Sequence, residues 1–525
     1  MERLEQAGFA CYIVGGAVRD WLAGGKPHDY DLCTAATPEQ TERIFSDLHV
    51  IETGLKHGTV TIVMDGEPIE ITTFRTEGAY SDGRRPDSVA FVTDITQDLA
   101  RRDFTVNAMA WSPRRGLCDP FGGKEDLARK HIRCVGDAET RFQEDALRIL
   151  RALRFASTRG YEIEAQTAQA LRDNRHRLTH VSAERITAEL LQIVSGAYAG
   201  AVCMEFAEIF AEILPEIAPM MGFQQCNPHH KYDVWEHSVR AMESIRPEPL
   251  LRLTMLFHDC GKPDTFTVDA QGIGHFYGHP AQSYVVAKRA VQHLRLPTQM
   301  EQQLLYLVRH HDTPLGQTKR SVRRKLAVHG EAIFRQLLAI KKADCIGQGT
   351  TPHNQTELLE TEQMLEEVLT EHDCLTRRDL AVNGHDLQAW GVSGRDIGFF
   401  LSEMLNRVLD EPENNTRERL KKIFEELQDG QNQIELTVSG MSAGCCVREV
   451  RRLMERIPEV QKTEVVLDSG QIVLYGQKIP LEQVRNALTA AGFEVVIGVW
   501  IINRFLSISI HSTSSAAVQT VCWNG

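Results

Sequence analysis

The stretch that decides the fold of the amino-terminal region is GGAVRD, Gly15 to Asp20, followed by HDYDL, His28 to Leu32. Asp29 and Asp31 are two residues apart, so in an extended segment their carboxylates point to the same face. Two Mg²⁺ ions need oxygen ligands from one side when they activate an attacking hydroxyl and neutralise a triphosphate. An Asp pair alone is a weak signal, but the preceding glycine-rich motif makes this one specific for phosphoryl chemistry.

Alternating strands flank this stretch. Cys11 to Val14 predicts a strand and Ala17 to Leu22 a helix, while Thr59 to Met64 and Pro68 to Phe74 predict a hairpin closed by an Asp-Gly turn. Glu70, in the second hairpin strand, is the candidate third carboxylate. The glycine pair lets the backbone approach phosphates closely at the start of the helix.

The bulk composition indicates several domains and local rather than global nucleic-acid contacts. The chain has 525 residues and a net charge of −13, so any RNA contact must be local. Arg141 to Arg159 and Lys319 to Lys325 are basic runs that fit such a contact, and a solvated charged helix face is the competing interpretation. The 12 cysteines show no paired framework and no leader is visible, which favours a reducing cytoplasm. Val495 to Ile510 is short and interrupted by polar residues, so we expect no membrane anchor.

The pattern along the chain predicts a multidomain protein, mixed α/β and all-α. We expect an α/β head over residues 1–138, a helical neck over 139–200 and a helical body over 201–430. Residues 431–499 read strand, helix, strand, strand, helix, strand, which is the order of a ferredoxin-like βαββαβ module. The tail, 500–525, has no readable pattern.

Several motifs in order resemble the class II tRNA nucleotidyltransferase and bacterial poly(A) polymerase family. RRDFTVN, Arg101 to Asn107, is similar to the family segment that recognises ribose and triphosphate. DPFGGKEDL, Asp119 to Leu127, resembles the springy segment between head and neck, EDALRILR, Glu144 to Arg151, the base-reading helix, and AERITAEL, Ala183 to Leu190, its supporting neck helix. The resemblance implies a nucleotide-binding set of Gly15, Gly16, Arg19, Arg102, Asp103, Asn107, Asp145, Arg148 and Arg151.

Base selection also follows from the chemistry of the base-reading helix. Asp145 and Arg148 are three apart, so on a helix they share a face. A carboxylate accepts from the exocyclic amine of C or A, and a guanidinium donates to their ring acceptors, a pattern that suits G and U less well. An ordinary ion pair is the competing interpretation. TEGAYSDGRRPDSV, Thr76 to Val89, resembles the loop of family members that add the terminal A, which favours CCA over CC addition.

The helical body contains a second set of chemistry-bearing residues. His237, His258, Asp259, His279, His311 and Asp344 combine imidazoles with carboxylates. This mixture of ligands suits a divalent transition metal. The residues fall in the order of the HD phosphohydrolase superfamily, an HD domain at about 230–350. This resemblance implies a first ligand set of His237, His258, Asp259 and Asp344, and a second ion at His279 and His311. A purely structural role for these ligands stays open.

The carboxyl-terminal module resembles heavy-metal-associated domains, whose loop reads GMxCxxC. Here the loop is GMSAGCC, Gly440 to Cys446, and Ala443 stands where the first thiolate is expected. Cys445 and Cys446 are adjacent and adjacent cysteines usually diverge, so soft-metal binding is the less favoured interpretation. The favoured one is a degenerate fold kept for docking.

These patterns predict template-independent addition or repair of the tRNA 3′-terminal CCA from CTP and ATP with Mg²⁺. Asp29 and Asp31 are the expected metal ligands, with Glu70 assisting. The alternatives are a poly(A) polymerase of the same family, a phosphohydrolase whose head is inactive, and a metal-responsive RNA-binding protein that is not an enzyme.

Overall fold

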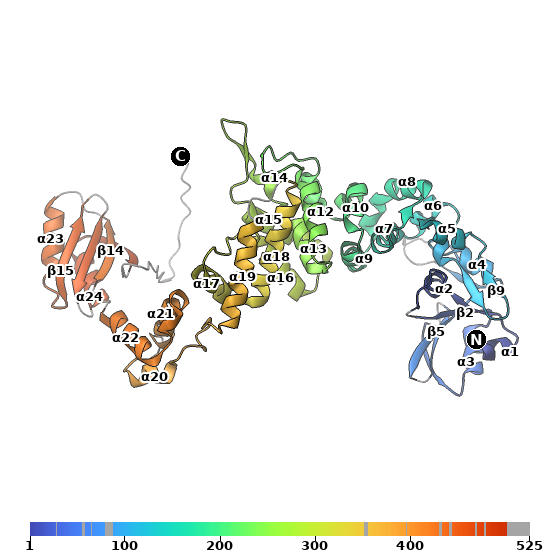
Figure 1. Ribbon diagram of the computed structural model, residues 1–525, viewed down its shortest axis with the longest axis horizontal. Helices are drawn as coiled ribbons and strands as arrows, with labels where there is room; N and C mark the ends of the chain where they lie inside the picture. Colours follow the sequence, from blue (N-terminus) through green and yellow to red (C-terminus); the bar gives the residue numbers. More distant parts are fainter. Residues whose placement is uncertain are drawn as a thin grey trace. The chain divides into compact units, whose positions relative to one another are not determined.

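The computed structural model describes residues 1–27, 29–54, 58–64, 66–78, 88–350, 355–394, 396–429, 433–439, 444–467, 470–476 and 479–500. They form two compact units, residues 1–317 with 329–363, and residues 318–328 with 364 onward (Figure 1). The centre of the predicted loop, 79–87, the start of the GMSAGCC loop, the Cys445 side chain and the tail from 501 lie outside the described residues.

The head is built on a seven-stranded sheet of order β3-β4-β5-β2-β1-β8-β9. β1 is buried on both faces, because Cys11 packs into one apolar cluster with Leu32 and Ile71, while Tyr12 and Val14 pack into another. Its strands are β1 (Cys11–Val14), β2 (Asp31–Thr34), β3 (His49–Gly54), β4 (Thr59–Met64), β5 (Glu67–Thr73), β8 (Ala110–Ser112) and β9 (Gly116–Cys118).

The predicted hairpin is confirmed, since β4 pairs antiparallel with β5 and Thr61 lies opposite Glu70. Gly66 in its turn has a φ of +86°, a conformation that favours glycine. The remaining head elements are α1 (Glu2–Gln6), α2 (Gly16–Leu22), α3 (Pro38–Ile44), β6 (Arg75–Glu77), β7 (Val89–Phe91), α4 (Ile95–Ala100), the 3₁₀ turn η2 (Thr105–Asn107), α5 (Gly123–Arg129) and β10 (His131–Ile132).

The neck is helical, as its periodicity predicts. Asp137 starts α6 by accepting from the Thr140 amide, and Gly160, in the left-handed conformation, ends α7. The neck elements are α6 (Ala138–Glu144), α7 (Leu147–Arg159), β11 (Glu162–Ile163), α8 (Ala165–Asp173), η3 (Arg175–His180), α9 (Ala183–Ser195), α10 (Ala199–Glu205), α11 (Ala207–Ile213) and η4 (Pro215–Met220).

The predicted base-reading helix is wrong at one position. Asp145 is extended, with φ −146° and ψ 103°, and it separates α6 from α7. Its Oδ1 accepts from the Leu147 amide, so the side chain caps the second helix at its start. Asp145 and Arg148 are therefore not one turn apart on a continuous helix.

The helical body of the first unit brings four helix ends together. Asp233 caps α12 at the Glu236 amide, and His258 and His311 are the C-terminal caps of α13 and α16. The elements are α12 (Val234–Ser244), α13 (Pro249–Phe257), α14 (Lys262–Thr265), β12 (Thr267–Val268), β13 (Gly274–His275), α15 (His279–Leu294), α16 (Thr298–His310), α18 (Glu331–Gly347) and α19 (Gln355–Thr370), the last of which runs on into the second unit.

The second unit contains a helical part and a four-stranded sheet of order β15-β16-β14-β17. Val450, Met454, Val484 and Leu488 from its two helices pack on one face of this sheet. The elements are α17 (Lys319–His329), α20 (Gly384–Ala389), α21 (Asp396–Asp410), η5 (Pro412–Asn414), α22 (Arg417–Asp429), β14 (Gln433–Ser439), α23 (Gly444–Met454), β15 (Val460–Val466), β16 (Gln471–Gly476), α24 (Leu481–Ala490) and β17 (Glu494–Trp500).

Within the described ranges, no single helix has the length and apolar content of a membrane span. α9 and α10 reach that content only when counted together, and they meet at an angle of 119°.

Candidate functional sites in the head and in the helical body

A polar cavity of about 520 Å³ lies where the head meets the neck. It contains the predicted nucleotide-binding residues together with Asp31. The lining residues are Gly15, Gly16, Arg19, Asp31, Arg101, Arg102, Asp103, Asn107, Asp145, Leu147, Arg148, Arg151, Arg154, Phe155 and Arg185. Seven of these fifteen residues are arginines, and each of the seven also forms an ion pair with a carboxylate. The cavity thus offers an anion many N–H donors, whose positive charge is already partly balanced.

Gly15 is at the closest approach of the backbone to this arginine cluster. Its φ is +66°, and a Cβ at this position would come 2.8 Å from Arg102 Nη1. The Arg102 guanidinium in turn donates to the Asn107 carbonyl at 3.4 Å. A side chain at Gly15 would therefore displace Arg102 as well as strain the turn.

A chain of hydrogen bonds fixes the orientation of the cavity wall. Arg19 Nη1 donates to Asn107 Oδ1 at 2.6 Å, and Asn107 Nδ2 donates to Asp103 Oδ1 at 3.2 Å. Arg151 donates to Asp103 Oδ2 through Nε at 2.9 Å and Nη2 at 2.7 Å. These hydrogen bonds hold side chains from α2, η2 and α7 in fixed positions relative to one another. Positioning a nucleotide needs preorganisation of this kind.

Asp103 is the centre of this chain and stays ionised. Burial alone would raise its pKa, but the Arg151 guanidinium, Asn107 and the Phe104 amide together hold the pKa below the usual range of an aspartate. The negative charge of Asp103 is balanced by its ion pair with Arg151. Its role is positioning.

Two of the three predicted metal-binding carboxylates, Asp31 and Glu70, lie on adjacent inner strands of the head sheet. Asp31 opens β2 and is exposed, and β2 runs parallel to β5 with Leu32 paired to Ile71. Because Asp31 and Glu70 each precede one residue of that pair, they are neighbours on adjacent strands. Asp29 is also exposed, just before β2. As a group of three, their oxygens do not all come within 4.8 Å of one another in the described part of the chain.

The predicted base readers both line the cavity, but each is held by another partner. Asp145 Oδ2 accepts from Arg185 Nη2 of α9 at 2.7 Å. Arg148 Nη1 donates to Glu144 Oε2 at 2.6 Å, and Nη2 donates to the Arg101 carbonyl at 3.3 Å. Asp145 and Arg148 are thus each paired with a different residue, Arg185 and Glu144.

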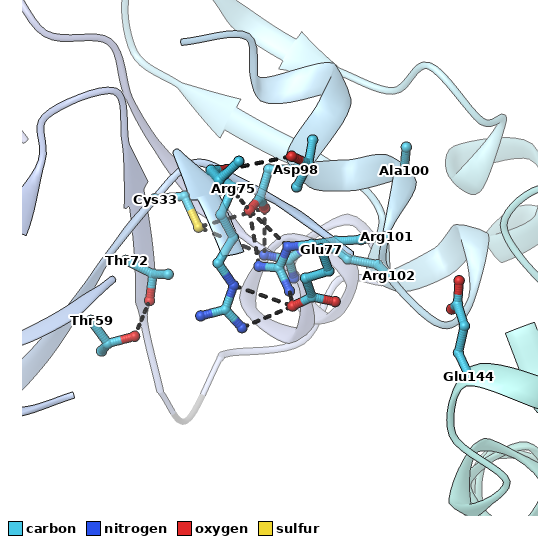
Figure 2. A network of polar contacts seen from close by, with 12 residues as sticks. Cys33, Thr59, Thr72, Arg75, Glu77, Asp98, Ala100, Arg101, Arg102 and Glu144 are labelled. Atoms are coloured by element: carbon cyan, nitrogen blue, oxygen red, sulfur yellow. Dashed lines mark hydrogen bonds and ion pairs between the residues drawn. The ribbon is translucent and has the colours of Figure 1, made fainter. Parts of the chain in front are cut away.

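Sequence reasoning missed a buried acidic network beneath the cavity. Asp98 is fully buried and accepts from Arg101 Nη2 at 2.9 Å and from the Arg75 amide at 3.2 Å. Figure 2 shows Glu77 receiving the guanidinium groups of Arg75 and Arg101, at 3.0 and 2.9 Å. The spacing of Asp98 three residues before Arg101 was the one available signal.

A second site lies in the helical body, where six predicted ligands come together. We call it the histidine–aspartate cluster. Its ligand atoms form two groups, each within 4.8 Å, that share Asp259. The first group is His237, His258, Asp259 and Asp344, and the second is Asp259, His279 and His311.

The two carboxylate oxygens of Asp259 face different groups. Oδ2 lies 3.1 Å from His237 Nε2 and 3.2 Å from His258 Nε2, whereas Oδ1 lies 3.4 Å from His279 Nε2. Oδ1 is buried and accepts no hydrogen bond from the described residues. A carboxylate placed in this way fits a bridge between two cations.

Three of the imidazoles are oriented by the backbone. Nδ1 of His258 lies 2.6 Å from the Met255 carbonyl, Nδ1 of His279 lies 2.9 Å from the Phe276 carbonyl, and Nδ1 of His311 lies 2.8 Å from the Val308 carbonyl. A carbonyl accepts only, so each Nδ1 carries a proton, and Nε2 is the ring nitrogen turned toward the cluster. This is the carbonyl–histidine pattern of metal-ligating imidazoles.

The electrostatics of the cluster also fit a cation. Burial lowers the pKa of His311 to about 3, so its Nε2 is an uncharged donor at neutral pH. Burial opposes charge on His258 as well, yet Asp259 and Asp344 outweigh it and raise its pKa to about 10. Part of the positive charge beside these two carboxylates comes from the buried Lys262, whose Nζ lies 2.7 Å from Asp259 Oδ2.

Of the two candidate soft-metal ligands, Cys445 and Cys446, only the Cys446 side chain belongs to the described residues. Cys446 packs against the apolar core of the carboxyl-terminal sheet. The groups of ligand atoms found among the described residues contain no cysteine.

The comparisons with known proteins agree with the head and neck. Residues 11–133 match the poly A polymerase head domain, and residues 160–221 match the probable RNA- and SrmB-binding site of polymerase A. Over these two segments the chain is similar to the poly A polymerase family.

The relatives it resembles carry one name. The CCA-adding enzyme of Leuconostoc citreum is 48% identical over 199 residues, 38% of this chain and 49% of that protein. The CCA-adding enzyme of Geobacillus stearothermophilus is 46% identical over 208 residues, 40% of this chain and 51% of that protein. The chain spans about half the length of the curated relatives it matches.

Solved structures extend the likeness over more of the chain. The Bacillus stearothermophilus CCA-adding enzyme in complex with CTP has a TM-score of 0.57 and 29% identity, covering 81% of this chain and 95% of that one. The Thermotoga maritima CCA-adding enzyme complexed with tRNA has a TM-score of 0.53 and 20% identity, covering 81% and 93%, and shares the fold.

Proposed function

We propose that this chain adds CMP and AMP to the 3′ end of tRNA without a nucleic-acid template and so completes or repairs CCA. The observation that carries the proposal is the arginine-lined cavity with Asp31 at its rim and the Asp103–Arg151 pair in its wall. The likeness to CCA-adding enzymes in sequence, and to one solved with CTP, supports the same substrates.

In the proposed reaction the tRNA 3′-oxygen bonds to the α-phosphorus, the bond to the pyrophosphate oxygen breaks, and the hydroxyl proton goes to solvent. Asp29, Asp31 and Glu70 offer only carboxylate oxygens, the donor set that suits Mg²⁺. Mg²⁺, when bound, supplies Lewis acidity at the hydroxyl and the triphosphate. The arginines of the cavity neutralise the triphosphate, and Gly15 leaves the space it needs.

Base selection falls to Asp145 and Arg148, as acceptor and donor on the same cavity wall. Arg185 and Glu144 hold these two side chains in fixed orientations at 2.7 and 2.6 Å. We infer that they read the base as a preorganised pair of separate groups, and not as one salt bridge. Arg185→Ala is expected to lower the preference for CTP and ATP over UTP and GTP.

The test is extension of a tRNA transcript that lacks CCA, with Mg²⁺ and CTP alone, ATP alone or both. We expect addition of C, C and A, and loss of all three in Asp29→Ala. Long A tails would replace this proposal with a poly(A) polymerase. Binding of tRNA without extension would leave a non-catalytic RNA-binding protein.

A second function, favoured by the shared Asp259, is metal-dependent hydrolysis of phosphoesters at the histidine–aspartate cluster. Water bonds to phosphorus, one P–O bond to ribose breaks, and the ribose oxygen takes up a proton. A divalent transition metal, when bound, supplies Lewis acidity. We expect phosphate release to vanish in Asp259→Ala and to persist in Asp29→Ala, while tRNA extension shows the reverse. Extension lost in both variants would mean that the two sites are not separate.

For the second unit we infer a ferredoxin-like module over 431–499 that acts in docking and not in metal transport. The packed position of Cys446 supports this assignment.

A further inference from the structure

An exposed aromatic pair lies beside the histidine–aspartate cluster. The Tyr277 side chain is 79% exposed, the highest value among the large apolar residues of the described chain. Its ring stacks on that of His275, with ring centres 5.4 Å apart and planes 9° from parallel. One face of Tyr277 is thus covered by His275, and the stack leaves the rest of the ring to solvent.

Asp269 and the hairpin of β12 and β13 hold this aromatic pair in place. His275 Nε2 lies 2.8 Å from Asp269 Oδ2, and Asp269 Oδ1 accepts from the Ile273 amide at 2.9 Å. These contacts close the hairpin of β12 and β13, in which Thr267 pairs with His275. An exposed ring fixed in this way loses little entropy when a second ring stacks on it.

The same segment positions a ligand of the cluster. Phe276 packs against Phe266 at 5.4 Å, and its carbonyl orients Nδ1 of His279 at 2.9 Å. Tyr277 is two residues before His279, so their Cα atoms are within about 7 Å of each other. The Phe276 ring lies 5.1 Å from Nζ of Lys262, which pairs with Asp259, while the neighbouring Tyr277 is exposed.

We propose that Tyr277 is a base-stacking platform that makes the cluster specific for a nucleoside 3′-phosphate, the phosphate meeting Asp259, His279 and His311. This inference rests on the hydrolase function proposed above and names its substrate class. Stacking on an aromatic face accepts any base and favours a purine, the larger ring system. A phosphoester without a base cannot stack on Tyr277, so Tyr277 does not raise its affinity for the cluster.

The experiment compares adenosine 3′-monophosphate, cytidine 3′-monophosphate and glycerol phosphate as substrates of the full-length chain loaded with Mn²⁺. In Tyr277→Ala we expect KM for the adenosine compound to rise about tenfold or more, with kcat nearly unchanged and no change for glycerol phosphate. Tyr277→Phe keeps the ring face and restores the wild-type KM. Tyr198→Ala, a tyrosine 52% exposed on the neck, is the matched control.

A binding readout separates this inference from the hydrolase proposal. In Tyr277→Trp, adenosine 3′-monophosphate is expected to quench an added tryptophan signal that wild type lacks, even if no phosphate is released. KM is also compared between an RNA oligonucleotide that ends in a 3′-phosphate and adenosine 3′-monophosphate. The substrate with the lower KM shows whether the platform binds an RNA end or a free nucleotide. Unchanged KM in Tyr277→Ala, an equal loss with glycerol phosphate, or absence of quenching would overturn the platform.

Discussion

The nucleotide cavity and the histidine–aspartate cluster both present carboxylates to cations, but they differ in burial and in assembly. In the head, Asp29, Asp31 and Glu70 are exposed and not drawn together as a set, and of these three only Asp31 lines the cavity. In the cluster, His237 and His258 are fully buried and Asp259 is 1% exposed, with the ligand atoms already converged.

This difference predicts two ways of using metal. Exposed oxygens around an open rim bind hard cations weakly, so Mg²⁺ arrives with the triphosphate that completes its coordination. Buried imidazoles oriented by backbone carbonyls hold a resident metal independently of substrate. One chain thus pairs a site that its substrate completes with one that is assembled beforehand.

The largest expected effect breaks the open site alone. Asp31→Ala is expected to lower tRNA extension by about a thousandfold, the scale of losing one group that stabilises developing charge. Glu70→Ala is expected to lose about ten- to a hundredfold, because Glu70 is absent from the cavity lining and acts beside Asp31. Steady-state extension rates measure both. Equal losses would contradict the lesser role of Glu70, and a loss of cluster metal in Asp31→Ala would contradict the separation of the two sites.

The next effect concerns metal retention. After loading with Mn²⁺ and gel filtration, we expect metal to remain with the chain, and Asp259→Asn to lower its affinity by about a hundredfold because Asp259 belongs to both ligand groups. Asp312→Asn is the matched control, since Asp312 follows His311 but is 63% exposed and outside both groups. Elemental analysis measures the content. Loss of metal from wild type on filtration would make the cluster structural.

A smaller effect tests the wall of the cavity. Arg151→Met leaves the buried Asp103 carboxylate without its cation, so we expect a loss of about 1–3 kcal/mol in the free energy of unfolding and a higher KM for CTP. Arg159→Met is the control, because Arg159 also pairs with an aspartate, Asp20 at 3.1 Å, but its side chain is 43% exposed. We expect this variant to lose less than about 1 kcal/mol in the free energy of unfolding. Urea denaturation measures both, and equal values would assign Asp103 no special role.

Much of the fold was predictable because its signals are local. The hairpin strands Thr59–Met64 and Glu67–Thr73 alternate over their length, and a one-residue slip would expose their apolar side chains. The order of the six cluster residues was equally readable, since each belongs to a compact motif. Their sharing of Asp259 was not, because it depends on how five helices pack: α12, α13, α15, α16 and α18.

The cavity could be predicted in its members but not in their pairing. Helical periodicity predicted one continuous helix through Asp145. In the structure Asp145 is extended and its Oδ1 accepts from the Leu147 amide, so the helix is interrupted there. Arg185 and Glu77 join the site from distant segments, 40 residues from Asp145 and 24 from Arg101. Only tertiary structure brings such partners together, and no local pattern records them.

The smallest effect is a pH dependence that separates Asp103 from an ordinary surface aspartate. Its pKa in the folded chain is lowered by Arg151, Asn107 and the Phe104 amide against the effect of burial. The folded state therefore releases this proton more readily than the unfolded state, and the stabilisation is complete above the ordinary aspartate range, about pH 4. It is lost as the pH falls through the lower folded value. Wild type should exceed Asp103→Asn by a constant free energy of unfolding between pH 5 and 8, by about 1 kcal/mol, and this difference should shrink below pH 4. A difference that grew on acidification would mean that Asp103 is protonated in the fold, and that Arg151 is held by something other than its charge.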